Sequence, residues 1–272
     1  MKRLNWVKLI VWAAALFTLG MLLFIIGFIV LNGLTALTPE IFAWHYTTEN
    51  VSMLPAIIST LILVAIALSI AVPIGVFTGF YLVEYANRKS RFVHFVRLAT
   101  DTLAAIPSIV YGLFGMLLFV IQLQFQFSML AGILTVVIMV LPIIISSTEE
   151  ALLTVNNSLR MGSLALGAGK LRTIFTVVLP VAMPGILSGV ILAVGRIVGE
   201  TAALLFTLGS ATGLPQNLMS SSRTLALHMY VLSSEGLHLK EAYATGTIII
   251  LLVVIINSIS TFLSKKLSQG GK

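Results

Sequence analysis

The chain has 272 residues, of which 58% are hydrophobic and only 9% are charged. So few charged side chains cannot cover a water-exposed surface, since soluble domains contain about 25% of them. The composition therefore excludes a soluble enzyme and predicts a single membrane domain. The absence of cysteine also excludes disulfides, thiolate metal sites and cysteine catalysis.

Six apolar stretches are long enough to cross a bilayer as helices, which requires about 20 mainly apolar residues. They cover residues 9–31, 56–82, 104–121, 129–147, 177–208 and 244–263. The first apolar run exceeds the core of a signal peptide, which has about 7–15 residues, so we expect a retained span. The fifth stretch is too long for one simple span, and Pro180 and Pro184 leave its start undefined. The prediction is an all-α membrane protein with six transmembrane helices.

Lysine and arginine residues gather on one side of these spans. Thirteen of the sixteen lie at the N-terminus, in the second and fourth loops or in the C-terminal tail, namely Lys2, Arg3, Lys8, Arg88, Lys89, Arg91, Arg97, Arg160, Lys170, Arg172, Lys265, Lys266 and Lys272. The opposite side has only Arg223 and Lys240. Because cytoplasmic loops are enriched in basic residues, both termini are expected in the cytoplasm. The net charge of +7 then reflects topology, and no nucleic-acid partner is expected.

The sequence contains no motif for catalysis or metal binding. Gly162 and Gly167 have the spacing of a phosphate-binding loop, but the Gly-Lys-Ser/Thr ending is absent. The four histidines lie in separate loops, and no Gly-x-Ser-x-Gly turn is present. We therefore expect no cofactor on this chain, so ATP and its Mg²⁺ would belong to a separate subunit.

The segment of residues 149–176, between the fourth and fifth stretches, is far less apolar than its neighbours. Its patterning is typical of a helix, with the small residues Gly162, Ser163, Ala165 and Gly167 close together. Such a helix suits docking into a groove on another protein. A solvated loop is the alternative that these residues leave open.

This segment resembles the cytoplasmic loop of permease subunits of ABC importers, whose pattern is Glu-Ala-Ala, three residues, Gly, nine residues and Ile-x-Leu-Pro. Here Met161-Gly162-Ser163 is followed by three residues and Gly167, and nine residues later by Val177-Val178-Leu179-Pro180. Met161 replaces the glutamate of the family and cannot make the ion pair of a glutamate with the ATPase. The resemblance implies a coupling helix that docks an ATPase subunit.

Two further strings resemble phosphate-specific ABC transporter permeases of the PstA type. The string that is similar to their third span covers residues 105–115 and includes Pro107, Ser108, Tyr111 and Gly112. The string that is similar to their fifth span covers residues 195–207 and contains Arg-x-x-Gly-Glu-Thr, from Arg196 to Thr201. The resemblance implies a bacterial inner-membrane complex with a homologous second permease, two cytoplasmic ATPase subunits and an external phosphate-binding protein.

Arg196 and Glu200 are the clearest charges inside a predicted span, where each costs about 2.5–3.5 kcal/mol on insertion. Four residues apart on one helix, they are expected to pair. A guanidinium matches a phosphate edge with two hydrogen bonds, so Arg196 is expected to contact the anion and Glu200 to compete for it after release. Thr201 would add a neutral donor. A purely structural pair at a subunit interface is the alternative.

The predicted function is a permease subunit of an ATP-driven importer of inorganic phosphate. Three alternatives remain open from the sequence. The first is an anion carrier driven by an ion gradient, with Glu200 as its proton site. The second is an ABC permease for another oxyanion, and the third is a membrane anchor without a path.

Overall fold

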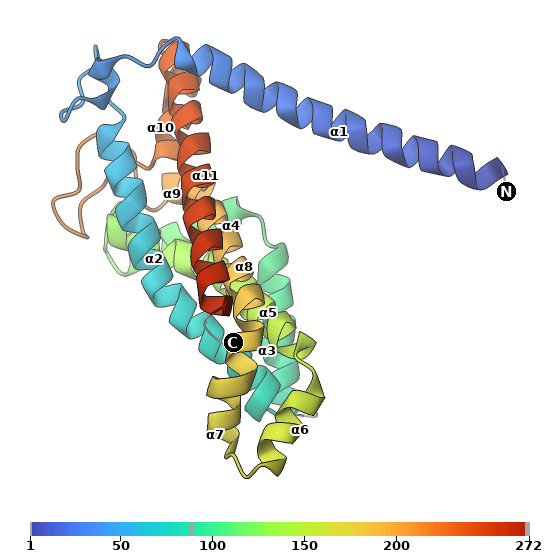
Figure 1. Ribbon diagram of the computed structural model, residues 1–272. Helices are drawn as coiled ribbons and strands as arrows, with labels where there is room; N and C mark the ends of the chain where they lie inside the picture. The colour runs from blue at the N-terminus through green and yellow to red at the C-terminus, as the bar shows by residue number, and fades with distance from the viewer. Residues whose placement is uncertain (1, 88–89, 270–272) are drawn as a thin grey trace.

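A computed structural model describes residues 2–87 and 90–269 of the chain. Of the basic residues that predict the orientation, the description leaves out Arg88, Lys89, Lys272 and the side chains of Lys2, Arg3, Lys265 and Lys266. Within the described ranges every regular element is a helix or a helical turn, and no strand is present (Figure 1). The predicted all-α architecture is confirmed.

The chain forms five long helices and several short ones. The long helices are α1 (Lys2–Leu34), α2 (Leu54–Phe80), α5 (Met129–Thr154), α8 (Leu179–Val198) and α11 (Leu239–Gln269). The shorter helices are α3 (Arg91–Ala105), α4 (Ser108–Gly115), α6 (Asn157–Ala165), α7 (Lys170–Thr173), α9 (Ala202–Leu205) and α10 (Leu225–Glu235). A 3₁₀ turn covers Pro39–Phe42, and π-helical turns cover Tyr81–Tyr85, Met116–Gln122 and Ile174–Val178.

Five helical segments of the described chain are long and apolar enough to cross a membrane, and a sixth is added if a bent pair counts as one span. That pair is α3 and the segment Ser108–Gln122, which meet at 104°. The sequence predicted one span over residues 104–121, but Ala104 and Ala105 belong to α3. The break arises because Pro107 forces Ile106 out of the helical conformation, to ψ 132°.

The predicted fifth span, residues 177–208, also has different bounds in the structure. The helical segment runs from Lys170 to Val198, so it begins and ends earlier than predicted. A π-helical turn directly precedes α8, and Pro180 lies just after it, inside this segment, where its missing N–H removes one backbone hydrogen bond. After Val198 the chain leaves the helix, and the remaining predicted residues form α9 and its turns.

Helix α5 lies at the centre of the bundle, between α2 and α8. The buried core joins Leu63 of α2, Ile133 and Ile144 of α5 and Ile197 of α8. By contrast, α1 diverges from the other long helices (Figure 1) and exposes apolar side chains along its length. It contacts α11 only near its own end, where the rings of Phe28 and Tyr243 meet edge to face at 5.7 Å.

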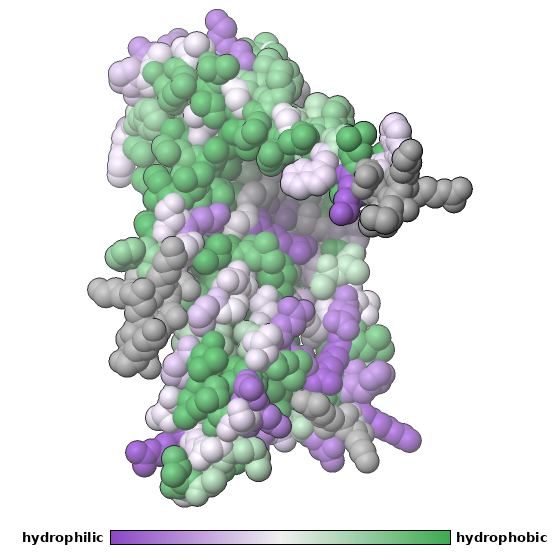
Figure 2. Space-filling view, turned by 45° about the vertical axis from the view of Figure 1, so that its right-hand side comes forward, coloured by the Kyte–Doolittle hydropathy of each residue, from purple (hydrophilic) through white to green (hydrophobic). Residues whose placement is uncertain are grey.

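The bundle has two different ends (Figure 1). Helices α6 and α7 lie at one end, called the α6 end below, and α10 lies at the other, called the α10 end. In the view of Figure 2, hydrophobic side chains cover broad areas, whereas hydrophilic ones gather near the top and over the lower part. This distribution is typical of a chain whose middle lies in a bilayer.

Candidate functional site

Helix α6 projects from the bundle at the α6 end, and none of its residues is buried. The Asn156 side chain accepts a hydrogen bond from the backbone N–H of Ser158 at 3.0 Å and caps the helix. Met161 and Leu164 are exposed, and Leu166, just after the helix, is 91% exposed. Apolar side chains held out in this way mark a surface that a partner covers.

The glycine of the sequence pattern ends this helix. Gly167 adopts a φ of +83°, which L side chains rarely do. Its N–H donates to the carbonyl of Leu164 at 3.0 Å, and the N–H of Ala168 donates to the carbonyl of Ser163 at 3.2 Å. These two bonds form a Schellman motif, so Gly167 is needed for the turn from α6 into α7.

The other residues of the predicted coupling segment lie in α6 and at its connection to α8. Gly162 and Ala165 are exposed, and a methyl group at position 162 would meet no atom within 4 Å. The hydroxyl oxygens of Ser163 and Thr173 lie 2.9 Å apart and join α6 to α7. Leu179 and Pro180 start α8, so the whole pattern spans the connection from α6 to α8.

Arg196 and Glu200 do not pair. The helix ends at Val198, and Glu200, 6% exposed, accepts a hydrogen bond at its Oε1 from the N–H of Ala203 at 2.9 Å. Glu200 therefore holds the start of α9. Within the described residues the Arg196 side chain has no hydrogen bond or ion pair, and the four-residue pairing predicted from a continuous helix is wrong.

The two strings that suggested a common path meet in space. A methyl group at Gly112 of α4 would lie 2.8 Å from the Cα of Ala203 in α9, so only glycine permits this close approach. Tyr111 is buried, and its hydroxyl donates to the carbonyl of Leu103 across the bend at 2.7 Å. Arg196 lies near enough to Tyr111 to interact with it electrostatically.

The remaining path residues flank this contact. Pro107 and Ser108 begin α4, with Pro107 exposed and Ser108 half-buried. Thr201 is half-buried, and its carbonyl accepts from the N–H of Leu205 at 2.9 Å. The structure thus brings the third-span and fifth-span strings together, with Arg196 as their unpaired cation.

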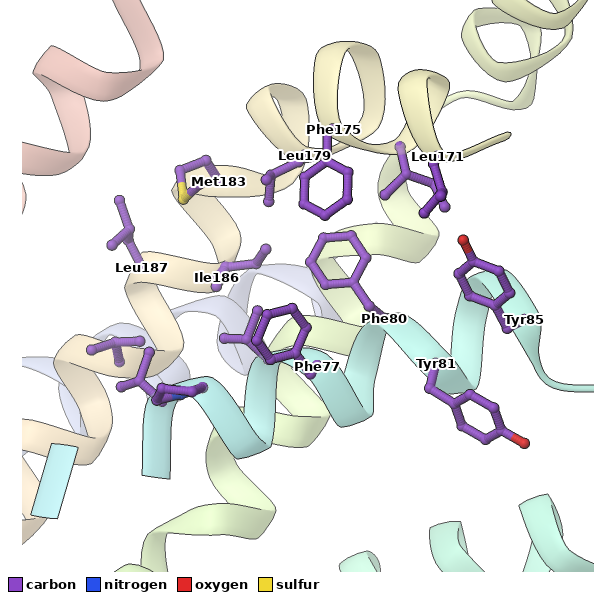
Figure 3. Close-up of a pocket in the computed structure, with 15 residues that line it drawn as sticks. Phe77, Phe80, Tyr81, Tyr85, Leu171, Phe175, Leu179, Met183, Ile186 and Leu187 are labelled. Carbon is purple, nitrogen blue, oxygen red and sulfur yellow. The ribbon is translucent and has the colours of Figure 1, made fainter. Parts of the chain in front are cut away.

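A pocket of about 550 Å³ lies between α2 and the segment from α7 to α8 (Figure 3). Phe77, Phe80 and Phe175 point into it, and Leu171 and Met183 line it further along. Apart from Tyr81 and Tyr85 this lining is apolar, and it offers an inorganic anion no cation. We therefore assign no substrate to this pocket.

The sequence reasoning missed a group of charges at the α6 end. Arg160 forms an ion pair with Glu84 at 3.0 Å, although 76 residues separate them. Lys170 donates to the carbonyl of Glu84 and lies over the Tyr85 ring, 4.4 Å from its centroid. No local spacing connects these residues, because only the tertiary fold brings the end of α2 to the loop that bears α6.

A second buried cluster lies at the α10 end. Arg223, 7% exposed, donates to the carbonyl of Ser210 from Nε at 3.0 Å and from Nη2 at 2.7 Å. Its Nη1 lies 3.4 Å from Nδ1 of His228, and the guanidinium lies over the Tyr46 ring at 5.6 Å. Burial lowers the pKa of Arg223, and burial with the adjacent guanidinium lowers the pKa of His228 to about 4.

Neither cluster is arranged as a metal site. Among the described residues, no three His, Cys, Asp or Glu side chains come together in a way that would hold a metal ion. Arg196 and the charges at the two ends of the bundle offer hydrogen bonds and charge to a ligand or partner.

The chain is similar to known transport proteins. It is 31% identical to the probable ABC transporter permease protein YqgI of Bacillus subtilis, over 90% of each chain. It is 35% identical to the phosphate transport system permease protein PstA of Haemophilus influenzae, over 84% of this chain and 82% of that one.

A bacterial alginate ABC transporter, solved in complex with an alginate pentasaccharide-bound periplasmic protein, has the same fold. Its TM-score is 0.68 at 14% identity, over 95% of each chain. Residues 71–270 match the family described as binding-protein-dependent transport system inner membrane component. The chain therefore belongs to this family of membrane-embedded transport components.

Proposed function

We propose that this chain is one of two permease subunits of an ATP-driven importer of inorganic phosphate. The assignment of phosphate as the substrate rests on the similarity to the phosphate transport permease of Haemophilus influenzae. This similarity extends over more than four fifths of both chains. The chain would form half of the path and would dock one ATPase subunit. Hydrolysis would take place on that subunit, which would hold ATP and Mg²⁺.

In this proposal the α6 end faces the cytoplasm. Arg97, Arg160, Lys170 and Arg172 belong to the loops that carry the excess of basic residues, as expected for the cytoplasmic side. The exposed apolar side chains of α6 would then enter a groove on the ATPase. Two such ATPase subunits would serve two permeases, one of them this chain and the other a homologous partner.

The α10 end would face outward and receive an external phosphate-binding protein. The alginate transporter of the same fold was solved with a periplasmic protein, which supports a partner of this kind. Selectivity for phosphate would then be shared between that protein and the path.

Arg196 is the residue that we expect to contact the anion. Its planar guanidinium offers two parallel donors to a phosphate edge. Because Glu200 holds α9, it is not free to displace phosphate as the helix pairing would have allowed. Release would depend instead on movement of α4 and α9, which meet at Gly112 and frame Arg196 and the half-buried Thr201.

The test is uptake of radiolabelled phosphate by the complete complex in proteoliposomes that contain ATP, with Arg196→Gln as the variant. We expect uptake to fall about tenfold or more, because a hydrogen bond to a charged group contributes about 1.5–3 kcal/mol. Lys240→Gln is the control, since it also removes one cation but from an exposed position at the start of α11.

Each alternative predicts a different result. Normal uptake by Arg196→Gln would overturn the anion role of this residue. Uptake that vanadate does not inhibit would favour a carrier driven by an ion gradient. Competition by sulfate as strong as that by phosphate would favour a permease for another oxyanion.

A further inference from the structure

Glu84 lies at the end of α2, in the π-helical turn Tyr81–Tyr85. Its Oε1 accepts from Nε of Arg160 at 3.1 Å and from Nη2 at 3.0 Å. The exposed fractions of the two side chains are only 9% for Glu84 and 16% for Arg160. The pair is thus shielded from water, unlike the surface ion pairs that contribute little.

The same arginine also binds the end of α5. Its Nη1 donates to the carbonyl of Val155 at 2.6 Å, and its Nη2 donates to the carbonyl of Leu152 at 2.8 Å. Carbonyls in the last turn of a helix lack partners within that helix. A single side chain of α6 therefore joins the ends of two membrane helices, α2 and α5.

Lys170 fixes the far side of the same loop. It begins α7, donates to the backbone carbonyl of Glu84 and packs over Tyr85. Glu84 therefore contacts two cations, Arg160 within α6 and Lys170 after it. The docking helix is held at both sides to one point on α2, whereas its tip at Leu166 remains exposed.

We propose that the Arg160–Glu84 pair is the joint that carries movement of α6 into α2 and α5. The proposal rests on the proposed function, in which an ATPase displaces α6. With the joint in place, α6 and the ends of α2 and α5 move as one body. Without it, the chain at Val155 and Asn156 and the turn at Gly167 absorb the displacement. Arg160 and Glu84 are therefore positioning residues, which touch no phosphate.

The first experiment compares transport with hydrolysis in the complete complex in proteoliposomes. Arg160→Gln and Glu84→Gln are the variants, and Arg172→Gln is the control, since the Arg172 side chain has no hydrogen bond or ion pair among the described residues. We expect the phosphate imported per ATP hydrolysed to fall about fivefold or more, in the range of typical coupling between sites. The two variants together should lose no more than either alone.

A role in folding or in ATPase binding would give another result. Uptake and ATP hydrolysis would then fall in parallel, or the ATPase would fail to co-purify, and either outcome would overturn the proposal. Arg160→Lys keeps the charge but lacks the fork that reaches Glu84 and two carbonyls, so we expect partial recovery of the ratio. Unchanged coupling in both glutamine variants would also overturn it.

A second measurement does not depend on the substrate. Because the chain has no cysteine, spin labels can be placed at Ser158→Cys in α6 and at Tyr81→Cys, both exposed positions away from the apolar tip of α6. On ATP binding their distance should stay constant in the otherwise unaltered complex and change in Arg160→Gln. Equal behaviour of the two complexes would refute the joint, whereas absence of phosphate uptake with the joint intact would refute only the proposed function.

Discussion

Two arginines at opposite ends of the bundle hold loops in different ways. Arg160, at the α6 end, bonds a carboxylate and two helix-terminal carbonyls. Arg223, at the α10 end, is more deeply buried and bonds a loop carbonyl beside His228. Among the described residues no carboxylate forms an ion pair with Arg223.

The difference shows how a charge can either link helices or close loops. At the α6 end opposite charges join α6 to the end of α2, and the same arginine binds the end of α5. At the α10 end the guanidinium links Ser210, Tyr46 and α10, and together with burial it lowers the pKa of the adjacent His228. This second arrangement should therefore be sensitive to acid, whereas the first should be sensitive to loss of either partner.

Lowering the pH should have the largest effect on stability, and it should act at the α10 end. The pKa of His228 is lowered from 6.5 to about 4 in the folded chain, so the unfolded chain binds the proton more readily. Its contribution to the free energy of unfolding is then fully present above pH 6.5 and is lost as the pH falls toward 4. The loss is about 3 kcal/mol between pH 7 and pH 4.

Thermal unfolding of the purified complex across this pH range measures the effect. His228→Gln keeps a polar side chain but does not titrate, so its pH dependence should be flatter in the same window. If the stability of the wild type and that of the variant change with pH in parallel, His228 is not responsible for the loss of stability in acid.

Removal of the buried cation should have the next largest effect. Arg223→Gln leaves the carbonyl of Ser210 with weaker partners, and we expect a loss of about 2 kcal/mol in stability. The apparent melting temperature of the complex should fall, with Lys240→Gln as an exposed control. If the variant is as stable as the wild type, Arg223 contributes no more to stability than an exposed cation does.

The smallest effect on stability is expected at the tip of the α6 end. Leu166→Gln changes a side chain that is almost wholly exposed, so stability should stay within about 0.5 kcal/mol. Binding of the ATPase should nevertheless weaken, as measured by co-purification. Leu237→Gln, at an exposed position of the α10 end, is the matched control. Equal retention of the ATPase in both variants would argue against docking at α6.

The sequence predicted the parts of the molecule that depend on local signals. Apolar runs identified the membrane helices, and the small residues before Gly167 indicated the exposed helix α6, although its end at this glycine was not predicted. Pro107 is compatible with a kink in an apolar run, but no local signal predicts a break of 104° between α3 and α4.

Contacts between distant parts of the chain could not be predicted from the sequence. The pairing of Arg196 with Glu200 assumed an unbroken helix, and the end at Val198 removes it. The contacts of Arg160 and Arg223 depend on how α2, α5 and the outer loops pack. Neither the 76-residue separation from Glu84 nor the burial of His228 leaves a periodic signal in the chain.

The attachment of α1 at one end makes it a long lever. Near that end, a methyl group at Gly33 would lie 2.4 Å from the carbonyl oxygen of Tyr243 in α11. A helix of 33 residues is about 50 Å long, so each degree of tilt at this contact moves its far end by about 1 Å. The glycine at position 33 thus permits the close contact that fixes α1 against α11.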